Sequence, residues 1–107
     1  MRIIARRTLL QFVESRADSR DHKALKSAVD AWFAEASKAH WTGTADVKAR
    51  YATASIVSAD RIVFNVKGND YRLVVAVDFE KSIVWIKWIG THRDYDRIDV
   101  KEIDHHG

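Results

Sequence analysis

Residues 61–89 have the sequence RIVFNVKGNDYRLVVAVDFEKSIVWIKWI, in which apolar and polar side chains alternate with a period of two. That period is typical of strands with one buried face. Gly68-Asn69 and Glu80-Lys81 interrupt the alternation, and both are typical of tight turns. The sequence therefore predicts an antiparallel meander of three consecutive strands, at residues 61–66, 71–79 and 83–89.

The positions of the two turns predict which residues face each other. A first hairpin centred on Gly68-Asn69 pairs Phe64 with Leu73 and Asn65 with Arg72. A second hairpin centred on Glu80-Lys81 predicts five further pairs, which are Leu73 with Trp88, Arg72 with Ile89, Val74 with Lys87, Val75 with Ile86, and Val77 with Val84. One face of this sheet is strongly apolar and is expected to receive the helices.

The other face, here called the open face, carries an unusual set of side chains. In the predicted register it holds Asn65, Arg72, Trp85 and Lys87, with the two cations as diagonal neighbours. Because the third strand ends at Gly90, Thr91 and His92 are expected to emerge close to Arg72. A slip of one residue in the register would move Arg72 and Lys87 to the apolar face.

Helical periodicity precedes the strands. Arg2–Ile4 is predicted to be a short strand, and the apolar spacing of residues 9–17 predicts a first helix. A second helix is predicted from an N-cap at Asp18-Ser19 to about Lys38, because its apolar residues form one stripe. These residues are Leu25, Ala28, Val29, Trp32, Phe33 and Ala36. Residues 45–60 fit neither period, so a short helix and an irregular connection both remain open. The predicted class is α+β, with two N-terminal helices on one face of a mainly antiparallel sheet.

Length and composition narrow the possible functions. The chain has 107 residues, the size of a single domain, so residues 1–107 are taken as one domain with a loosely ordered tail at 100–107. Its 18 Lys and Arg against 15 Asp and Glu give a net charge of +3, too small for a dedicated nucleic-acid coat protein. The absence of cysteine excludes disulfides and thiolate metal sites. No apolar run approaches the roughly 20 residues of a membrane helix, and no signal peptide is recognisable, so we expect a cytoplasmic protein.

The polar residues near the end of the third strand suit chemistry on a phosphodiester. Arg72 and Lys87 can hold a phosphate and stabilise the charge that builds on it in a transition state. His92 can transfer a proton near neutral pH. Each residue also has an ordinary interpretation: His92 as a loop histidine, and Arg72 and Lys87 as solvated sheet residues.

Several separated motifs together resemble one known family. They are Val63-Phe64-Asn65-Val66-Lys67-Gly68-Asn69-Asp70-Tyr71-Arg72-Leu73-Val74, then Gly90-Thr91-His92-Arg93-Asp94-Tyr95-Asp96, with Asp46-Val47-Lys48 and Ser58-Ala59-Asp60-Arg61 in support. From Met1 to about Asp99 the chain resembles the HigB toxins of type II toxin–antitoxin systems. The resemblance implies a RelE-like fold and an mRNA interferase that cuts mRNA on translating ribosomes. It also implies a HigA-type helix-turn-helix antitoxin and a toxin–antitoxin hetero-oligomer.

We assign roles to individual residues as hypotheses, from their chemistry and their places in the predicted register. The expected catalytic residues are His92 as general acid or base, Arg72 for the phosphate charge, Tyr95 for stacking or proton transfer, and Asp96 for orientation. The expected RNA contacts are Lys48, Arg50, Lys67, Lys87 and Arg93, with Trp85 stacking on a base. Lys67 departs from the family pattern, because relatives often have a second glycine there. The expected chemistry is attack by the ribose 2′-OH, without a cofactor or metal.

Two further interpretations remain open. The chain could be a binding module of the same fold that docks on ribosomal RNA or a protein partner without cutting. Alternatively, its basic face could serve only to dock an acidic segment of an antitoxin. Trp32, Trp41 and Trp88 are expected in or at the edge of the core, where tryptophan is most often found. Asp104-His105-His106 resembles a metal site on paper, but a frayed terminus seldom holds three ligands in place, so no metal site is predicted.

Overall fold

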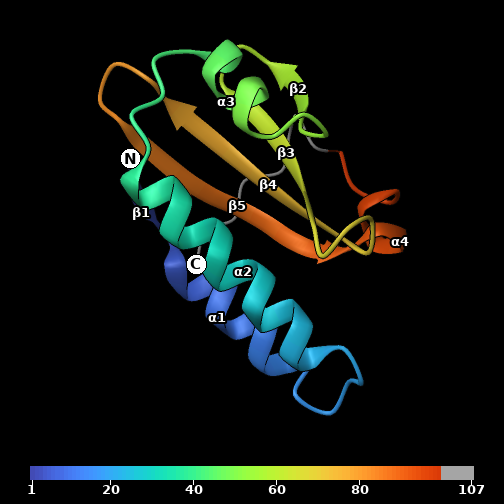
Figure 1. Cartoon of the computed structure of the whole chain (residues 1–107). Coiled ribbons are helices and arrows are strands. Elements are labelled where there is room, and N and C mark those ends of the chain that lie inside the picture. Colours follow the sequence, from blue (N-terminus) through green and yellow to red (C-terminus); the bar gives the residue numbers. More distant parts are fainter. Residues whose placement is uncertain (100–107) are drawn as a thin grey trace.

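The structure is a computed structural model, and it describes residues 1–99 (Figure 1). The element order is β1 (Arg2–Ile4), α1 (Arg6–Ser15), α2 (His22–Lys38), α3 (Thr44–Arg50), β2 (Ser55–Ser58), β3 (Arg61–Val66), β4 (Tyr71–Asp78), β5 (Ile83–Thr91) and α4 (His92–Tyr95). The predicted α+β class is confirmed. The uncertain segment 45–60 contains both a short helix, α3, and an edge strand, β2.

The five strands form one sheet in the order β1-β5-β4-β3-β2. The predicted meander is present, and β2 extends it by one antiparallel strand. The short strand predicted at Arg2–Ile4 is also present, and it pairs in parallel with β5 at residues Ile83 to Trp85. The last long strand of the chain therefore lies inside the sheet, between the first strand and β4.

The first hairpin has the predicted register. Phe64 pairs with Leu73 and Asn65 with Arg72, and the pairing closes at Val66 and Tyr71. The connection is four residues long rather than two. Lys67 and Gly68 both have positive φ angles, of 53° and 64°. A left-handed backbone costs glycine little but is unfavourable for lysine, so Lys67 is a strained position.

The second hairpin departs from the predicted register at a β-bulge. Val75 pairs with Ile86 as expected, but Val74 pairs with Trp88, so Lys87 is an extra residue on β5. Beyond the bulge Leu73 pairs with Ile89 and Arg72 with Gly90. The predicted pairs Leu73–Trp88, Arg72–Ile89 and Val74–Lys87 are wrong, because one inserted residue exchanges the two faces of the strand.

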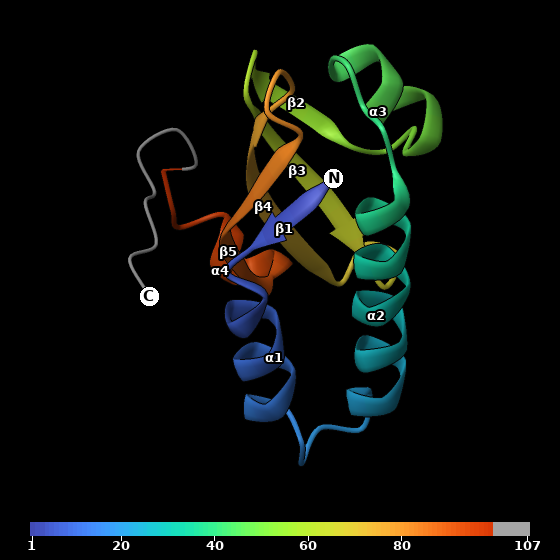
Figure 2. The ribbon, with the colours of Figure 1, turned by 90° about the vertical axis from the view of Figure 1, so that its left-hand side faces the viewer.

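Helices α1 and α2 form a hairpin that packs against the apolar face of the sheet (Figure 2). Both helices contribute buried side chains to the main core, including Leu9, Leu25 and Trp32. The sheet contributes the predicted apolar residues, among them Ile62, Phe64, Leu73, Val75, Val84 and Ile86. Trp32 and Trp41 are buried as expected, whereas Trp88 is half-buried on the other side.

Helix α2 begins later than predicted. Its N-cap is Asp21, not Asp18 or Ser19, and the Asp21 carboxylate makes no capping bond. Instead this carboxylate accepts hydrogen bonds from the hydroxyls of Ser19 and Tyr71, the latter at 2.5 Å. Asp21 therefore links the α1–α2 loop to the start of β4.

Candidate functional site

The β3–β4 turn, the end of β5 and helix α4 meet at one end of the sheet (Figure 1). Two ladder pairs bring them together, Tyr71 with Thr91 and Arg72 with Gly90. In addition, the backbone N–H of His92 donates to the carbonyl of Asp70 at 2.9 Å. The structure therefore places Arg72 and His92, which are 20 positions apart in the sequence, at the same end of the sheet.

Arg72 is half-buried and its guanidinium is held by the turn that precedes it. One terminal nitrogen donates to the Asn69 side-chain oxygen at 2.6 Å, and the other donates to the Asn69 carbonyl at 3.0 Å and the Tyr71 carbonyl at 3.2 Å. A planar guanidinium fixed on two atoms of one residue has lost most of its rotational freedom. Arg72 is thus pre-oriented at the edge of the sheet.

Helix α4 carries two of the four predicted catalytic residues, His92 and Tyr95, and a third, Asp96, is its C-cap. Thr91 caps it, with the side-chain oxygen accepting from the Asp94 N–H at 3.1 Å. His92 is exposed, Tyr95 is half-buried, and Asp96 is exposed at the C-cap. The imidazole and the carboxylate are therefore accessible to a ligand, and the Tyr95 ring is partly covered.

Trp88 is a residue of this site that sequence reasoning placed wrongly. The bulge turns its side chain away from the helices and onto the open face, where its ring lies 6.2 Å from that of Tyr95. Ile86 and Ile89 are three positions apart and both belong to the main core, which in a strand of period two requires a bulge between them.

Lys87 and Trp85 lie further along β5. Trp85 pairs with Ala76 on the open face as predicted and is half-buried. Lys87 is the bulge residue between Ile86 and Trp88, and it is also half-buried. The predicted diagonal relationship between Lys87 and Arg72 is wrong, because it required an uninterrupted register.

Lys67 is engaged by carboxylates. Its ammonium lies 2.7 Å from Asp70 and 3.8 Å from Asp21, and the hydrogen bond to Asp70 is the main reason that the pKa of Lys67 is raised. The pKa of Asp21 is lowered, chiefly by the hydrogen bonds from Ser19 and Tyr71. These contacts join the β3–β4 turn to the α1–α2 loop. Arg93, in contrast, is exposed on α4.

Lys48 and Arg50 lie on α3, away from the end of the sheet where α4 is found (Figure 1). The Lys48 ammonium donates to the carbonyls of Ala52 and Ala54, at 2.7 and 2.6 Å, and so fixes the chain that follows the helix. Arg50 pairs with Glu35. Burial and the neighbouring Glu35 raise the pKa of Tyr51 to about 12. The structure does not bring Lys48 and Arg50 together with Arg72 and His92.

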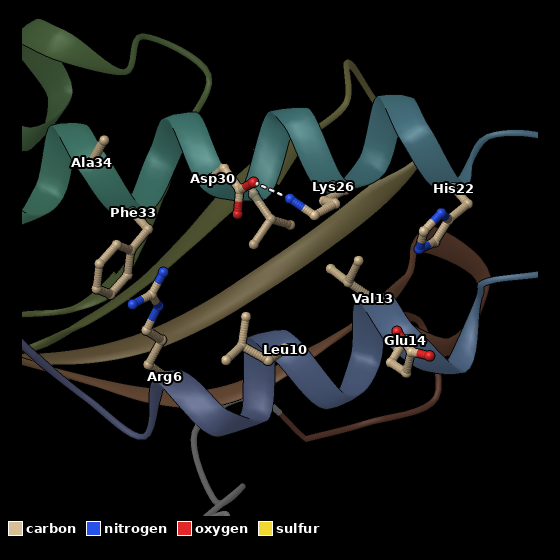
Figure 3. A pocket seen from close by; sticks show the side chains of 10 residues that line it. Arg6, Leu10, Val13, Glu14, His22, Lys26, Asp30, Phe33 and Ala34 are labelled. Carbon is tan, nitrogen blue, oxygen red and sulfur yellow. Dashed lines mark hydrogen bonds and ion pairs between the residues drawn. The ribbon is translucent and has the colours of Figure 1, made fainter.

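A groove of about 460 Å³ lies elsewhere, between α1 and α2 (Figure 3). Apolar side chains line it, including Leu10 and Phe33, with the Lys26–Asp30 ion pair above them. None of the predicted site residues lines this groove. It is therefore separate from the β3–β4 turn and α4.

Two properties of the described part of the chain bear on other predictions. Within residues 1–99 no helix is long and apolar enough to cross a membrane. Across the same residues no three His, Cys, Asp or Glu side chains gather in a way that could hold a metal ion. The segment Asp104-His105-His106 and the predicted tail at 100–107 lie outside the described residues.

Comparison with known protein families identifies the chain. Residues 25–98 match the model of the HigB toxin family, described as the RelE-like toxic component of a toxin–antitoxin system. No curated protein matches the chain. The matched segment covers more than half of the sequence and contains the β3–β4 turn, Arg72 and all of α4. A component of this kind has an antitoxin as its partner. The chain therefore belongs to the HigB family of RelE-like toxins.

Proposed function

We propose that the protein is an mRNA interferase that cleaves mRNA on translating ribosomes and so inhibits translation and growth. The observation that carries this proposal is the meeting of Arg72 and His92 at one end of the sheet. A fixed guanidinium and an accessible imidazole at the same end of the sheet can combine charge stabilisation with proton transfer.

The proposed reaction is an internal transesterification of RNA. The ribose 2′-oxygen attacks the adjacent phosphorus while a base removes its proton. The bond from phosphorus to the 5′-oxygen breaks, and an acid protonates that leaving oxygen. The products are a 2′,3′-cyclic phosphate and a free 5′-hydroxyl. The substrate supplies its own nucleophile, so the reaction needs no metal-bound water, and DNA, which lacks the 2′-OH, is not cut.

The residues divide this work according to their chemistry. Arg72 stabilises the charge that develops on the non-bridging phosphate oxygens. His92 serves as general acid or base. Tyr95 stacks on a base or shares the proton transfer, and Asp96 orients His92 or Arg72. His92 and Tyr95 lie on α4, and Asp96 is its C-cap.

The residues proposed to contact RNA differ in how close they lie to Arg72 and in how free their charges are. Arg93 lies on α4 beside His92, and Trp85 and Lys87 lie on β5, so these three fit one binding surface with Arg72. Lys67 neutralises Asp70 and Asp21 and contributes less free charge. Lys48 and Arg50 would contact a distant part of the RNA, because α3 is remote from α4 (Figure 1).

The proposed partner is a HigA-type helix-turn-helix antitoxin, which binds the toxin in a cytoplasmic hetero-oligomer. That assembly would keep the toxin inactive until the antitoxin is lost. A useful first observation is the neighbouring gene, which should encode a small DNA-binding protein.

The decisive experiment is to map mRNA 5′ ends after induction of the protein, with Arg72→Ala as the matched inactive control. New ends within translated codons, absent from the control, are expected. Growth arrest without new ends would instead support the non-cleaving binding module. A second experiment checks the metal-independent chemistry. The purified toxin is treated with a metal chelator before ribosomes and mRNA are added, and cleavage of the ribosome-bound mRNA is expected to persist.

A further inference from the structure

We propose that Trp88 and Gly90 are positioning residues, which together set the place of α4 and its catalytic side chains relative to Arg72. This inference rests on the proposed function, since it concerns the same site. Neither residue needs to touch RNA in this role. Both act through Tyr95 and the helix that carries it.

The bulge at Lys87 makes the arrangement possible. In an uninterrupted strand Trp88 would point toward the helices and Ile89 toward the open face. The extra residue reverses both, so Ile89 enters the main core and Trp88 pairs with Val74 on the open face. The Trp88 indole therefore lies near the end of β5, just before α4.

Gly90 provides the space in which the Trp88 ring lies. A Cβ atom at position 90 would stand 2.5 Å from both Cη2 and Cζ2 of Trp88, and 3.3 Å from Cζ3. Contacts under 3 Å are far inside van der Waals separation, so any other residue would force the indole to move. The backbone at Gly90 lies in the ordinary negative-φ range, so space rather than backbone conformation requires glycine here.

The Trp88 ring in turn supports α4. A helix of four residues cannot be stable alone and must be held by its surroundings. The holding contacts are the Thr91 cap, the bond from the His92 N–H to the Asp70 carbonyl, and the contact between the rings of Trp88 and Tyr95. The first two fix the start of the helix, and the ring contact fixes its end.

The consequence is a geometric requirement on catalysis. Moving the Trp88 ring away from Gly90 displaces Tyr95, and with it the orientation of His92 and Asp96 against Arg72. A misplacement of about 1 Å in a catalytic group can reduce a rate by about 100-fold. Substrate affinity, which depends on charge, should change much less.

The test is a double-mutant cycle with Gly90→Ala and Trp88→Leu, measured as kcat and KM for ribosome-bound mRNA. Gly90→Ala is expected to lower kcat by about 100-fold with KM within about 3-fold of wild type. In the Trp88→Leu background, where the far ring atoms are gone, the same substitution should cost less than about 3-fold. Gly43→Ala is the matched control, because a Cβ there meets nothing within 4 Å.

A wild-type rate in Gly90→Ala, or an equal loss in both backgrounds, would overturn the inference. If Gly90→Ala fails to fold, the cleavage rates of Trp88→Leu and of the double variant are compared instead. The proposal expects these two rates to be nearly equal, and unequal rates count against it. If the wild-type protein cuts no RNA, the proposed function fails by itself. The side-chain NMR signals of His92 and Tyr95 then carry the test: they should shift in Gly90→Ala and not in Gly43→Ala.

Discussion

Arg72 and Asn69 are joined by two hydrogen bonds, from the Arg72 guanidinium to the side-chain oxygen and to the carbonyl of Asn69. The two residues are three apart, across the end of the β3–β4 turn. The turn therefore reverses the chain and also orients the Arg72 guanidinium, which we propose binds the scissile phosphate.

Replacing Arg72 or His92 with alanine should abolish cleavage and growth arrest while leaving the protein folded. Neither side chain belongs to the main core. The measurement is mRNA cleavage on ribosomes, with circular dichroism and thermal unfolding as controls for folding. Full toxicity of a well-expressed Arg72→Ala variant would exclude the proposed role of Arg72.

Asn69→Ala should lower the cleavage rate by about 10-fold, because the guanidinium loses one of its two fixed acceptors on this residue. The backbone carbonyl of residue 69 remains, so the loss is smaller than in Arg72→Ala. Asn69→Asp retains the oxygen and should cleave faster than Asn69→Ala. The reverse order of these two variants would argue against orientation by Asn69.

Lys67→Gly and Lys67→Ala should differ in stability although both lack the ammonium. At a φ of 53° glycine is unstrained and alanine is not. We expect the alanine variant to be less stable by about 1 kcal/mol in urea unfolding. Equal stabilities would mean that the turn relaxes to another conformation.

Acidification should destabilise the protein in part through Asp21. Its pKa is lowered from 3.8 by the Ser19 and Tyr71 hydroxyls, so the stability it contributes is present above about pH 4 and is lost as the pH falls through the lowered pKa. Tyr71→Phe removes one donor and should move the pKa of Asp21 upward, as measured by NMR titration of the carboxyl group. Tyr51→Phe, a change remote from Asp21, serves as the control. An unchanged Asp21 titration in Tyr71→Phe would contradict the assignment.

Lys48→Ala should destabilise the protein by about 1 kcal/mol, because the ammonium that bonds the carbonyls of Ala52 and Ala54 is lost. Lys48→Arg keeps the charge and so separates the two roles of this residue, which are the bonds to the Ala52 and Ala54 carbonyls and the proposed contact with RNA. If Lys48 contacts RNA through its charge, Lys48→Arg should bind RNA like the wild type. A variant of wild-type stability with weakened RNA binding would show that the contact with RNA dominates.

The sequence predicts the meander well because period-two alternation and turn residues are local signals. The β3–β4 register follows directly from Gly68-Asn69. The β4–β5 register is right only up to Val75, since a bulge depends on how Ile86 and Ile89 both reach the core. The pairing of β1 with β5 is a long-range contact that no local pattern encodes.

The candidate site was predicted correctly where the strand register was correct, and wrongly beyond the bulge. Arg72 and His92 share one end of the sheet because Arg72 belongs to the correctly placed hairpin and His92 directly follows β5. Lys87 and Trp88 were misplaced by the bulge. The internal bonds of Lys48 and Lys67 depend on where side chains fold back, which spacing alone does not determine.

The position of β5 between β1 and β4 also governs when the protein can fold during synthesis. Strand β1 is made first, yet its sheet partner consists of residues 83–91. Pairing across so long a separation delays folding, and domains form as units once their chain has emerged. A ribosome making this protein therefore carries an incomplete sheet until β5 and α4 have been made. The cleavage that we propose thus requires synthesis of the chain at least through Tyr95.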